Sequence, residues 1–231
     1  LGDVYKRQYL ERVYQRNLAE QLMAQGVTII DPARLDIRGK VSIGQDVTLD
    51  VNVVLEGEVS IGNDVYIGPG CVLRNTHIGD GVQMQAMCVA DNARIGNNSE
   101  VGPFSRFRPG AELQGDNHIG NFVEIKNSVI GRGSKVNHLT YIGDTDMGSK
   151  VNIGAGTITA NYDGANKHRT TIEDEASTGS NTVLVAPVTV GRGATIGAGS
   201  VITKEVPAGK LTLSRAKQVT IDGWQRPVKK K

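Results

Sequence analysis

The chain has 231 residues, a formal net charge of +2 and only 4% aromatic residues. The near-neutral charge gives no electrostatic reason to expect nucleic acid or a membrane as the main partner, and the shortage of rings favours a narrow aliphatic interior over a broad core. Cys71 and Cys88 form neither a disulfide framework nor a zinc-binding CxxC pair, and no apolar run reaches membrane-spanning length or reads as a signal peptide, so we expect a cytoplasmic protein.

The first predicted element in chain order is an amphipathic helix over residues 9–25. Apolar residues recur there at helical spacing, at Leu10, Val13, Tyr14, Leu18 and Leu22. Gly26 follows them and predicts the end of the helix. The preceding eight residues, LGDVYKRQ, carry no usable pattern and are interpreted as a fragment edge or an artefact. Residues 1–26 are therefore expected to form a linker helix.

From about Val27 to Lys204 an apolar residue recurs every six positions, with occasional steps of five, and glycine often follows it. This period fits neither a helix nor a hairpin meander. It predicts a parallel β-helix in which three hexapeptides form one triangular coil, with about ten coils in all. The inward series is Ile43, Leu49, Leu55, Ile61, Ile67, Leu73, Ile78, Met84, Val89, Ile95, Val101, Phe107, Leu113, Ile119, Ile125, Ile130, Val136, Ile142, Met147, Ile153, Ile172, Thr178, Leu184, Val190, Ile196 and Ile202.

The position two residues before each of these is also expected to face inward, at a tighter place. It holds small or β-branched residues such as Val47, Val65, Ser134 and Ala194, and Cys71 is interpreted in the same way, as a buried small residue and not a nucleophile. The repeat is lost after Lys204. We assign residues 27–204 to the β-helix and residues 205–231, which end in GWQRPVKKK, to an irregular C-terminal arm with a solvated tail.

Counting by sixes brings two cations to the same outward slot, one coil apart. Arg108 and Lys126 both occupy the position after an inward residue, where glycine is usual. Cations stacked ~5 Å apart repel each other. A pair of solvated surface cations is one interpretation; a bound anion such as a phosphate group explains the stacking better.

The same edge carries further reactive groups. His138 lies on the corner that leads into the next face, and Tyr141 stands one coil above Glu124. One coil above Tyr141 the repeat is interrupted by an external loop near residues 160–170, NYDGANKHR from Asn161 to Arg169. Loops that interrupt a solenoid often carry its function, so this edge is the predicted site.

Five segments, taken together, resemble one known family. They are RFRPGAEL, GNFVEIK, HLTYIGD, NIGAGTITANYDGANKHRT and LVAPVTVG. The combination is similar to the acetyltransferase domain of the bifunctional N-acetylglucosamine-1-phosphate uridyltransferase (GlmU) family, over nearly the whole chain. The resemblance implies an all-β fold, a left-handed parallel β-helix shaped as a triangular prism. The hexapeptide repeat alone would indicate only the wider acyltransferase superfamily.

The resemblance also implies an activity. In the family, acetyl-CoA donates its acetyl group to the amine of glucosamine 1-phosphate, on the route to UDP-N-acetylglucosamine and to peptidoglycan and lipopolysaccharide precursors. The second family activity needs a nucleotidyltransferase domain with a G-x-G-T-x-M signature and a magnesium site, and this sequence contains neither. Magnesium is expected only for that missing domain, and no metal is expected here.

Site residues follow from the resemblance, position by position. His138 would be the general base, with Glu124 orienting its imidazole. The substrate-binding set would be Arg108 and Lys126 for the phosphate, Tyr141 and Asn152 for the sugar, and Lys167 as a helper. Backbone N–H groups of the loop would stabilise the oxyanion. The acetyl-CoA positions would be Ala155, Asn161, Tyr162, Ser180, Ala198 and Arg215.

The resemblance further implies a homotrimer with active sites between neighbouring prisms. The C-terminal arm would then reach an adjacent subunit, with Trp224 and Arg226 near the CoA or the interface. One stretch departs from the family pattern, because EDEASTGSN places Thr178 in an inward slot and Ala176 where bulk is usual. We expect this coil to be loosely packed and to weaken CoA binding beside Ser180.

Three other interpretations remain open. A zinc-dependent γ-type carbonic anhydrase shares the fold, but it needs clustered histidines, and the four here are scattered at His77, His118, His138 and His168. The chain could instead be another hexapeptide acetyltransferase with a different acceptor. It could also be an inactive trimerising scaffold.

Overall fold

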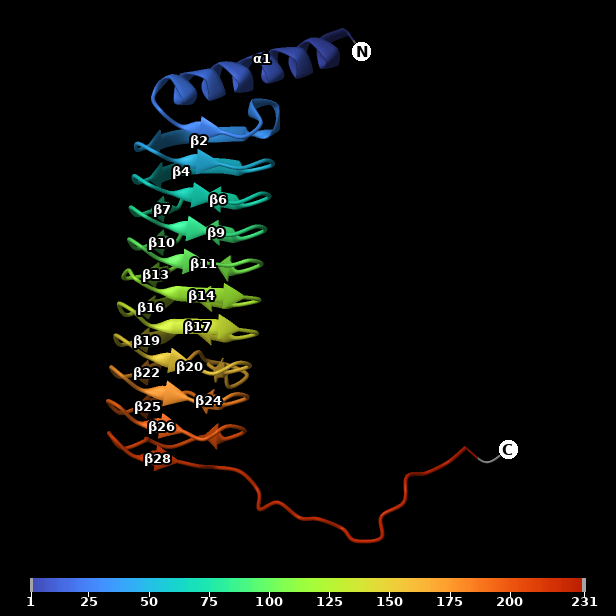
Figure 1. Ribbon diagram of the computed structural model, residues 1–231, viewed down its shortest axis with the longest axis vertical. Helices are drawn as coiled ribbons and strands as arrows, with labels where there is room; N and C mark the ends of the chain where they lie inside the picture. Colours follow the sequence, from blue (N-terminus) through green and yellow to red (C-terminus); the bar gives the residue numbers. More distant parts are fainter. Residues whose placement is uncertain (1, 230–231) are drawn as a thin grey trace.

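The computed structural model describes residues 2–229, which form a parallel β-helix with a single helix lying across its first coil (Figure 1). Helix α1 spans Gly2–Ala24, and a short 3-10 helix spans Pro32–Arg34. The C-terminal arm leaves the last coil as an extended strand of chain (Figure 1). Every strand pairing between coils is parallel, as the hexapeptide repeat predicts.

The strands stack on three faces. The first face is one eleven-stranded sheet: β1 (Thr28–Ile29), β3 (Thr48–Leu49), β5 (Tyr66–Ile67), β8 (Gln83–Met84), β11 (Glu100–Val101), β14 (His118–Asn121), β17 (Lys135–His138), β20 (Asn152–Ile153), β23 (Ser177–Thr178), β26 (Thr195–Ile196) and β28 (Leu211–Thr212). The second face holds β6 (Val72–Arg74), β9 (Val89–Asp91), β12 (Arg106–Phe107), β15 (Glu124–Lys126), β18 (Tyr141–Gly143), β21 (Ile158–Ala160), β24 (Val183–Val185) and β27 (Val201–Ile202). The third face holds β7 (His77–Ile78), β10 (Arg94–Ile95), β13 (Ala111–Leu113), β16 (Ser128–Ile130), β19 (Thr145–Met147), β22 (Thr170–Ile172) and β25 (Val188–Val190). The longer β2 (Asp36–Ile43) and β4 (Val54–Ile61) run from the second face onto the third.

The inward series is confirmed with one correction. Its members stack in register from coil to coil, as Ile119 does on Val136 and Ile125 on Ile142, and nearly all are fully buried. Ile43 is only partly buried. The correction concerns Val89, which faces outward, while Ala90 is buried and pairs with Leu73 and Phe107. The step of five therefore falls after Ala90. With this shift, the shorter steps occur at the corner between the second and third faces.

That corner is a left-handed turn in successive coils. Its residues have positive φ and are Gly57, Asn75, Asn92, Gly110, Asn127 and Asp144. Glycine, asparagine and aspartate tolerate this conformation better than other residues. The shared turn type keeps the coils in register as they stack.

Helix α1 differs from the expected amphipathic helix. It includes residues 2–8, and Leu10 and Tyr14 are 64% and 56% exposed. Docking relies instead on Gln15, Ala19 and Leu22, which are buried against the first coil. The Gln15 amide donates to the Ile37 carbonyl and accepts from the Ile37 N–H, both at 2.8 Å. This side chain replaces the neighbouring strand that the first coil lacks.

The last coils extend beyond the expected boundary at Lys204. Strand β28 pairs with β26, and Val206 is fully buried and bridges to Val190. The inward slot of Thr178 is filled by a hydrogen-bonded side chain, because its Oγ1 accepts from the Gly154 N–H at 3.0 Å. Over residues 2–229 no helix has both the length and the apolar character that a membrane crossing requires.

Candidate active site

His138 lies at the corner between the first and second faces, at the end of β17. It is solvent-exposed, and the first-face register places it directly above Asn121. Its Nδ1 lies 3.0 Å from the Oδ1 of Asn121. An amide oxygen only accepts, so this contact places the imidazole hydrogen on Nδ1 and leaves Nε2 free to take a proton.

Glu124 does not contact the imidazole in this chain, which corrects the expectation that it orients His138. The register sets Glu124 below Tyr141, as expected, and above Arg106. Its carboxylate accepts from Arg108 Nη1 at 3.0 Å and lies 3.8 Å from the Arg106 guanidinium. Glu124 therefore holds the arginines in place, and Asn121 takes the orienting position.

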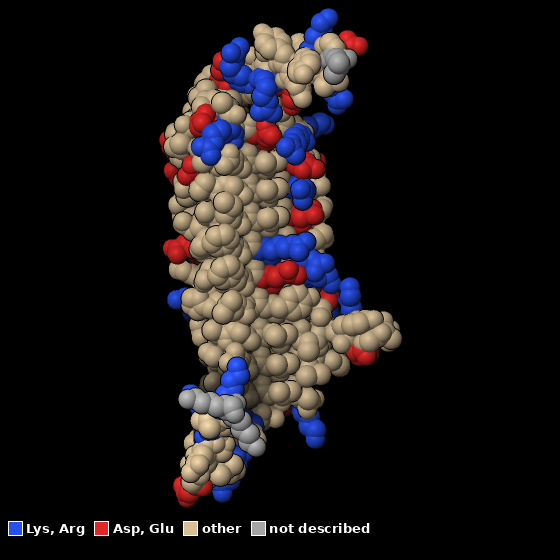
Figure 2. Space-filling view, turned by 90° about the vertical axis from the view of Figure 1, so that its right-hand side faces the viewer, with Lys and Arg blue, Asp and Glu red and all other residues tan. Residues whose placement is uncertain are grey.

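The two stacked cations lie in equivalent slots of neighbouring coils, as expected from the pairing of Phe107 with Ile125. Each has its own carboxylate, which sequence reasoning did not foresee. Arg108 contacts Glu124, and the Nζ of Lys126 lies 3.4 Å from the Oδ2 of Asp144. Figure 2 shows basic and acidic side chains gathered midway along one face of the column. These ion pairs fix the cations without an added ligand.

A third cation arrives from the external loop. Its Lys167 amine lies beside that of Lys126, and a hydrogen bond between the two amines favours the proton on Lys126. This bond raises the pKa of Lys126, as Asp144 also does, and lowers the pKa of Lys167. Nearby Arg108 pushes the pKa of Lys167 in the same direction. Three basic side chains thus converge where sequence reasoning placed a phosphate.

Asp144 is a second site residue, after Asn121, that the sequence analysis did not identify. It is 5% exposed and accepts hydrogen bonds from the side-chain amides of Asn127, at 2.5 Å, and Asn161. Burial alone would raise the pKa of this carboxyl, but the two amides and the Lys126 ammonium outweigh burial and hold the pKa below its usual value. The carboxylate is therefore ionised at neutral pH.

Tyr141 lies flat across the second face because Gly143 has no side chain. A Cβ at Gly143 would stand 2.3 Å from the Tyr141 hydroxyl and 2.6 Å from its Cζ. The hydroxyl reaches towards the Asn161 amide nitrogen, 3.5 Å away. Gly143 occupies the slot above Lys126, so the phenol lies directly beyond the stacked cations.

The external loop is a small hairpin fastened by one side chain. Asp163 Oδ1 accepts from the backbone N–H groups of Asn166 and Ala165, and Oδ2 lies 2.7 Å from His168 Nε2. The Asn166 N–H, the imidazole and the Ala165 N–H, in that order, hold the pKa of Asp163 below its usual range. The hairpin presents Lys167 to the site and leaves Tyr162 61% exposed.

Three of the expected acetyl-CoA positions continue the column that begins with Asn121 and His138. Backbone bonds run from Gly156 N to His138 O, from Asn181 N to Ala155 O, and from Gly199 N to Ser180 O. Ala155, Ser180 and Ala198 therefore lie above His138 on successive coils, about 4.8 Å apart. Arg215 closes the column, since its Nη1 donates to the Ala198 carbonyl at 3.1 Å.

Asn152 is not brought to this cluster. It faces outward from β20 on the first face, above Lys135, whereas Arg108, Lys126 and Tyr141 lie on the second face. One small sugar cannot touch both faces of the same prism. The arrangement brings the other twelve expected residues to one edge and leaves Asn152 apart.

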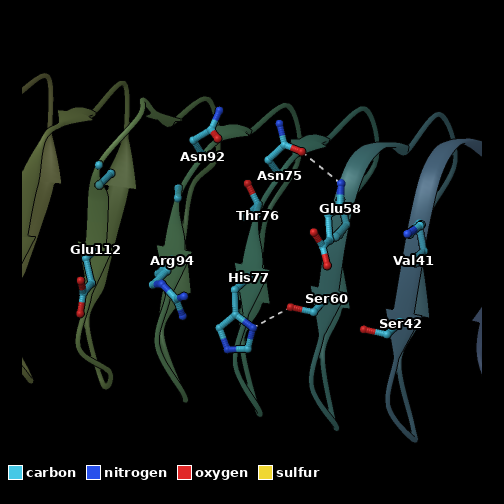
Figure 3. A pocket seen from close by; sticks show the side chains of 15 residues that line it. Val41, Ser42, Glu58, Ser60, Asn75, Thr76, His77, Asn92, Arg94 and Glu112 are labelled. Atoms are coloured by element: carbon cyan, nitrogen blue, oxygen red, sulfur yellow. Dashed lines mark hydrogen bonds between the residues drawn. The ribbon is translucent and has the colours of Figure 1, made fainter.

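A separate groove of ≈ 870 Å³ lies on the third face of the first coils (Figure 3). Ser60 Oγ and His77 Nδ1 meet there at 2.7 Å, and Arg94 and Glu112 continue the same row. Within residues 2–229, the one side-chain hydrogen bond of the His77 ring is the one to Ser60, whereas a nucleophile and base pair requires a third group that orients the base. Among the described residues, no group of three or more His, Cys, Asp or Glu side chains could hold a metal ion.

Cys71 is fully buried inside the prism, as expected for a small core residue, and so is Cys88. Contact with the Cys88 thiol, followed by burial, raises the pKa of Cys71 far above its usual value. A buried thiol of this kind is inert as a nucleophile at neutral pH.

Comparison with known proteins agrees with the fold. The profile of the GMPPB C-terminal domain matches residues 37–113, and that of the bacterial transferase hexapeptide (six repeats) matches residues 169–204. The chain is a hexapeptide-repeat protein of the left-handed β-helix type. Among solved structures, the UDP-N-acetylglucosamine acyltransferase of Francisella novicida is 18% identical with a TM-score of 0.47, covering 81% of this chain and 65% of that chain.

Sequence relatives narrow the family further. Over 96% of its length the chain is 60% identical to the bifunctional protein GlmU of Cupriavidus pinatubonensis and to that of Ralstonia pickettii, and 57% identical to that of Acinetobacter baumannii. It spans 49% of each relative, about half its length. Over nearly its whole length, the chain is therefore similar to about one half of the GlmU proteins.

Proposed function

We propose that this chain transfers the acetyl group of acetyl-CoA to the amine of glucosamine 1-phosphate. The observation that carries the proposal is the single edge on which a free imidazole nitrogen, three clustered cations and an axial column of small residues meet. The cations suit a phosphate, and the column suits an extended cosubstrate. The imidazole between them suits the proton that acyl transfer must remove.

The reaction divides among these groups. The neutral amine attacks the thioester carbonyl and forms the C–N bond, while Nε2 of His138 accepts the amine proton. Loop N–H groups near Asn161 and Tyr162 would stabilise the oxyanion. The C–S bond then breaks, the CoA thiolate leaves, and His138 can return its proton to that sulfur. A thioester is already activated, so no covalent enzyme intermediate is needed.

Binding roles follow the geometry. Arg108, Lys126 and Lys167 would hold the phosphate as charge-assisted hydrogen-bond donors. The phenol of Tyr141, which lies beyond them, would contact the sugar ring. Acetyl-CoA would lie along the corner column, held by Ala155, Asn161, Tyr162, Ser180, Ala198 and Arg215.

We further propose that the active unit is a homotrimer in the cytoplasm. Asn152 could reach a sugar held on the second face only from a neighbouring prism. Beside the His138 column runs an apolar ladder of Met87, Phe104, Phe122 and Leu139, each more than half exposed and each at positive φ. Bulky residues are rare in that conformation. Burial of this ladder against a second copy of the chain would remove its apolar surface from water and would compensate for the backbone strain.

Thiol release tests the activity. Purified protein is mixed with acetyl-CoA and glucosamine 1-phosphate, and free CoA is followed with a thiol reagent. His138→Ala should lower turnover by about 10²–10⁴-fold, whereas the matched control His77→Ala, an exposed histidine on the third face, should not change it. Release with a different acceptor only would indicate another acetyltransferase. If the wild type released no thiol with any acceptor, the chain would be interpreted as an inactive scaffold.

A further inference from the structure

Asp144 carries a charge that its place in the fold does not require. The corresponding corner of earlier coils is formed by Gly57, Asn75, Asn92, Gly110 and Asn127, all at positive φ and none of them charged. Asp144 has the same conformation, with φ 49°. An uncharged residue is therefore sufficient to form this turn, so we attribute the carboxylate to its contacts with neighbouring side chains.

Those groups belong to both halves of the site. One carboxylate contacts Lys126, on the phosphate side, and accepts from the amide of Asn161, the first residue of the external loop. Its backbone is fixed from both directions, since its N–H donates to the Lys126 carbonyl at 3.0 Å and its carbonyl accepts from the Thr170 N–H at 3.1 Å. Asp144 thus contacts strand β15 of the neighbouring coil, the first residue of the loop, and strand β22 after the loop.

The burial of this carboxylate makes the contacts strong. Its side chain is 7% exposed and that of Lys126 is 18% exposed. Ion pairs and charge-assisted hydrogen bonds are stronger where water is excluded. Removal of one partner leaves the other as an unpaired buried charge, which destabilises the folded state. Without the carboxylate, Lys126 would face Lys167 with no counter-charge, and Asn161 would lose its acceptor.

We propose that Asp144 is a positioning residue that holds the phosphate-binding lysine and the root of the external loop in one arrangement, so that a single carboxylate sets both substrate subsites. This inference rests on the proposed function. It predicts that one substitution at a residue that touches neither substrate weakens the binding of both.

The test compares wild type with Asp144→Asn and Asp116→Asn. Asp116 is a matched control, because it also has positive φ, at 52°, but pairs with Arg132 on the exposed surface. In Asp144→Asn the KM values for glucosamine 1-phosphate and for acetyl-CoA should each rise about tenfold, the size of one lost charge-assisted contact. The kcat should change less. Asp116→Asn should match wild type.

Calorimetric titration with glucosamine 1-phosphate separates the two proposals. If wild type binds the sugar phosphate but releases no thiol, the proposed function fails while Asp144→Asn still tests the positioning of Lys126. If wild type is active and Asp144→Asn shows the same two KM values as Asp116→Asn, the positioning role is overturned. A rise in only one KM would also overturn it, because the coupling of the subsites is the claim.

A second variant covers the case in which Asp144→Asn does not fold. Asn127 holds Asp144 from the coil below and has no place in the reaction. Asn127→Gly suits its φ of 45°, as Gly57 and Gly110 show at the same corner. It should raise both KM values by about threefold, less than Asp144→Asn does, because the lost hydrogen bond acts on the two subsites only through Asp144. Unchanged values would refute the positioning role without any change to the carboxylate itself.

Discussion

Phe122 offers the sharpest test of assembly through the apolar ladder. Its side chain is 53% exposed, at φ 57°, and its ring stacks on Phe104 with centroids 5.4 Å apart. Asparagine adopts positive φ at lower cost than phenylalanine. In Phe122→Asn, relief of that strain should offset the lost stacking, so the folded single chain should keep its stability.

The association of copies of the chain should be weakened by the same substitution. About half of a phenylalanine surface of ~200 Å² is exposed here, so burial in an interface would remove roughly 100 Å² from water. At about 25 cal/mol per Å² this amounts to ~2.5 kcal/mol for each copy. Loss of that contribution should raise the dissociation constant about 70-fold.

Sedimentation equilibrium over a range of protein concentrations measures this change. The control is Ile30→Asn, since Ile30 is 57% exposed but lies at the first coil, away from the ladder. Wild type and Ile30→Asn should remain assembled at concentrations where Phe122→Asn dissociates. An unchanged assembly for Phe122→Asn would show that copies meet elsewhere, and a lowered unfolding temperature of its single chain would refute the strain argument.

Three further outcomes follow from single contacts. The folded-state pKa of Asp163 is depressed, so its contribution to the stability of the hairpin is present above its unfolded pKa and is lost only as pH falls through the lower folded pKa. Amide exchange of the two N–H groups bound to Asp163, corrected for intrinsic rates, should therefore show equal protection at pH 7 and pH 5. Asp163→Ala should abolish this protection. Thr178→Val removes a bonded buried hydroxyl and should cost about 1 kcal/mol in denaturant unfolding, whereas Thr170→Val removes the buried Oγ1 that has no partner among the described residues and should be neutral or stabilising. Gly143→Ala should displace the Tyr141 ring and raise the KM for the sugar phosphate severalfold with little change in stability, and an unchanged KM would remove the phenol from the binding site.

The six-residue periodicity predicted the prism because nearly every inward position holds an apolar residue. It failed at Val89, where a more hydrophobic residue stood next to the alanine that is buried. Hydrophobicity cannot locate a step of five on its own; the position of the corner turn does so. Helix α1 was misread for a related reason, since its docking depends on the hydrogen bonds of Gln15 and only partly on apolar contacts.

The site was predictable where it follows the coil count and hidden where it depends on side-chain direction. The cation pair, the imidazole and the loop all follow from register. The contact of Asn121 with His138 could have been found in the same way, because the two residues are 17 positions apart, one coil with a single short step. Asp144 turns its carboxylate back into the site, and the only sequence signal is an aspartate at a corner that elsewhere holds asparagine or glycine.

A stack of parallel strands can in principle grow without limit, since its outermost rung always offers free peptide groups to the next molecule. Here the glutamine amide of Gln15 occupies both peptide groups of Ile37 at the N-terminal end of the column. A second prism that approached this end could not pair with the peptide groups of Ile37, and helix α1 lies across the first coil. The N-terminal end of the column is thereby blocked against fibre growth.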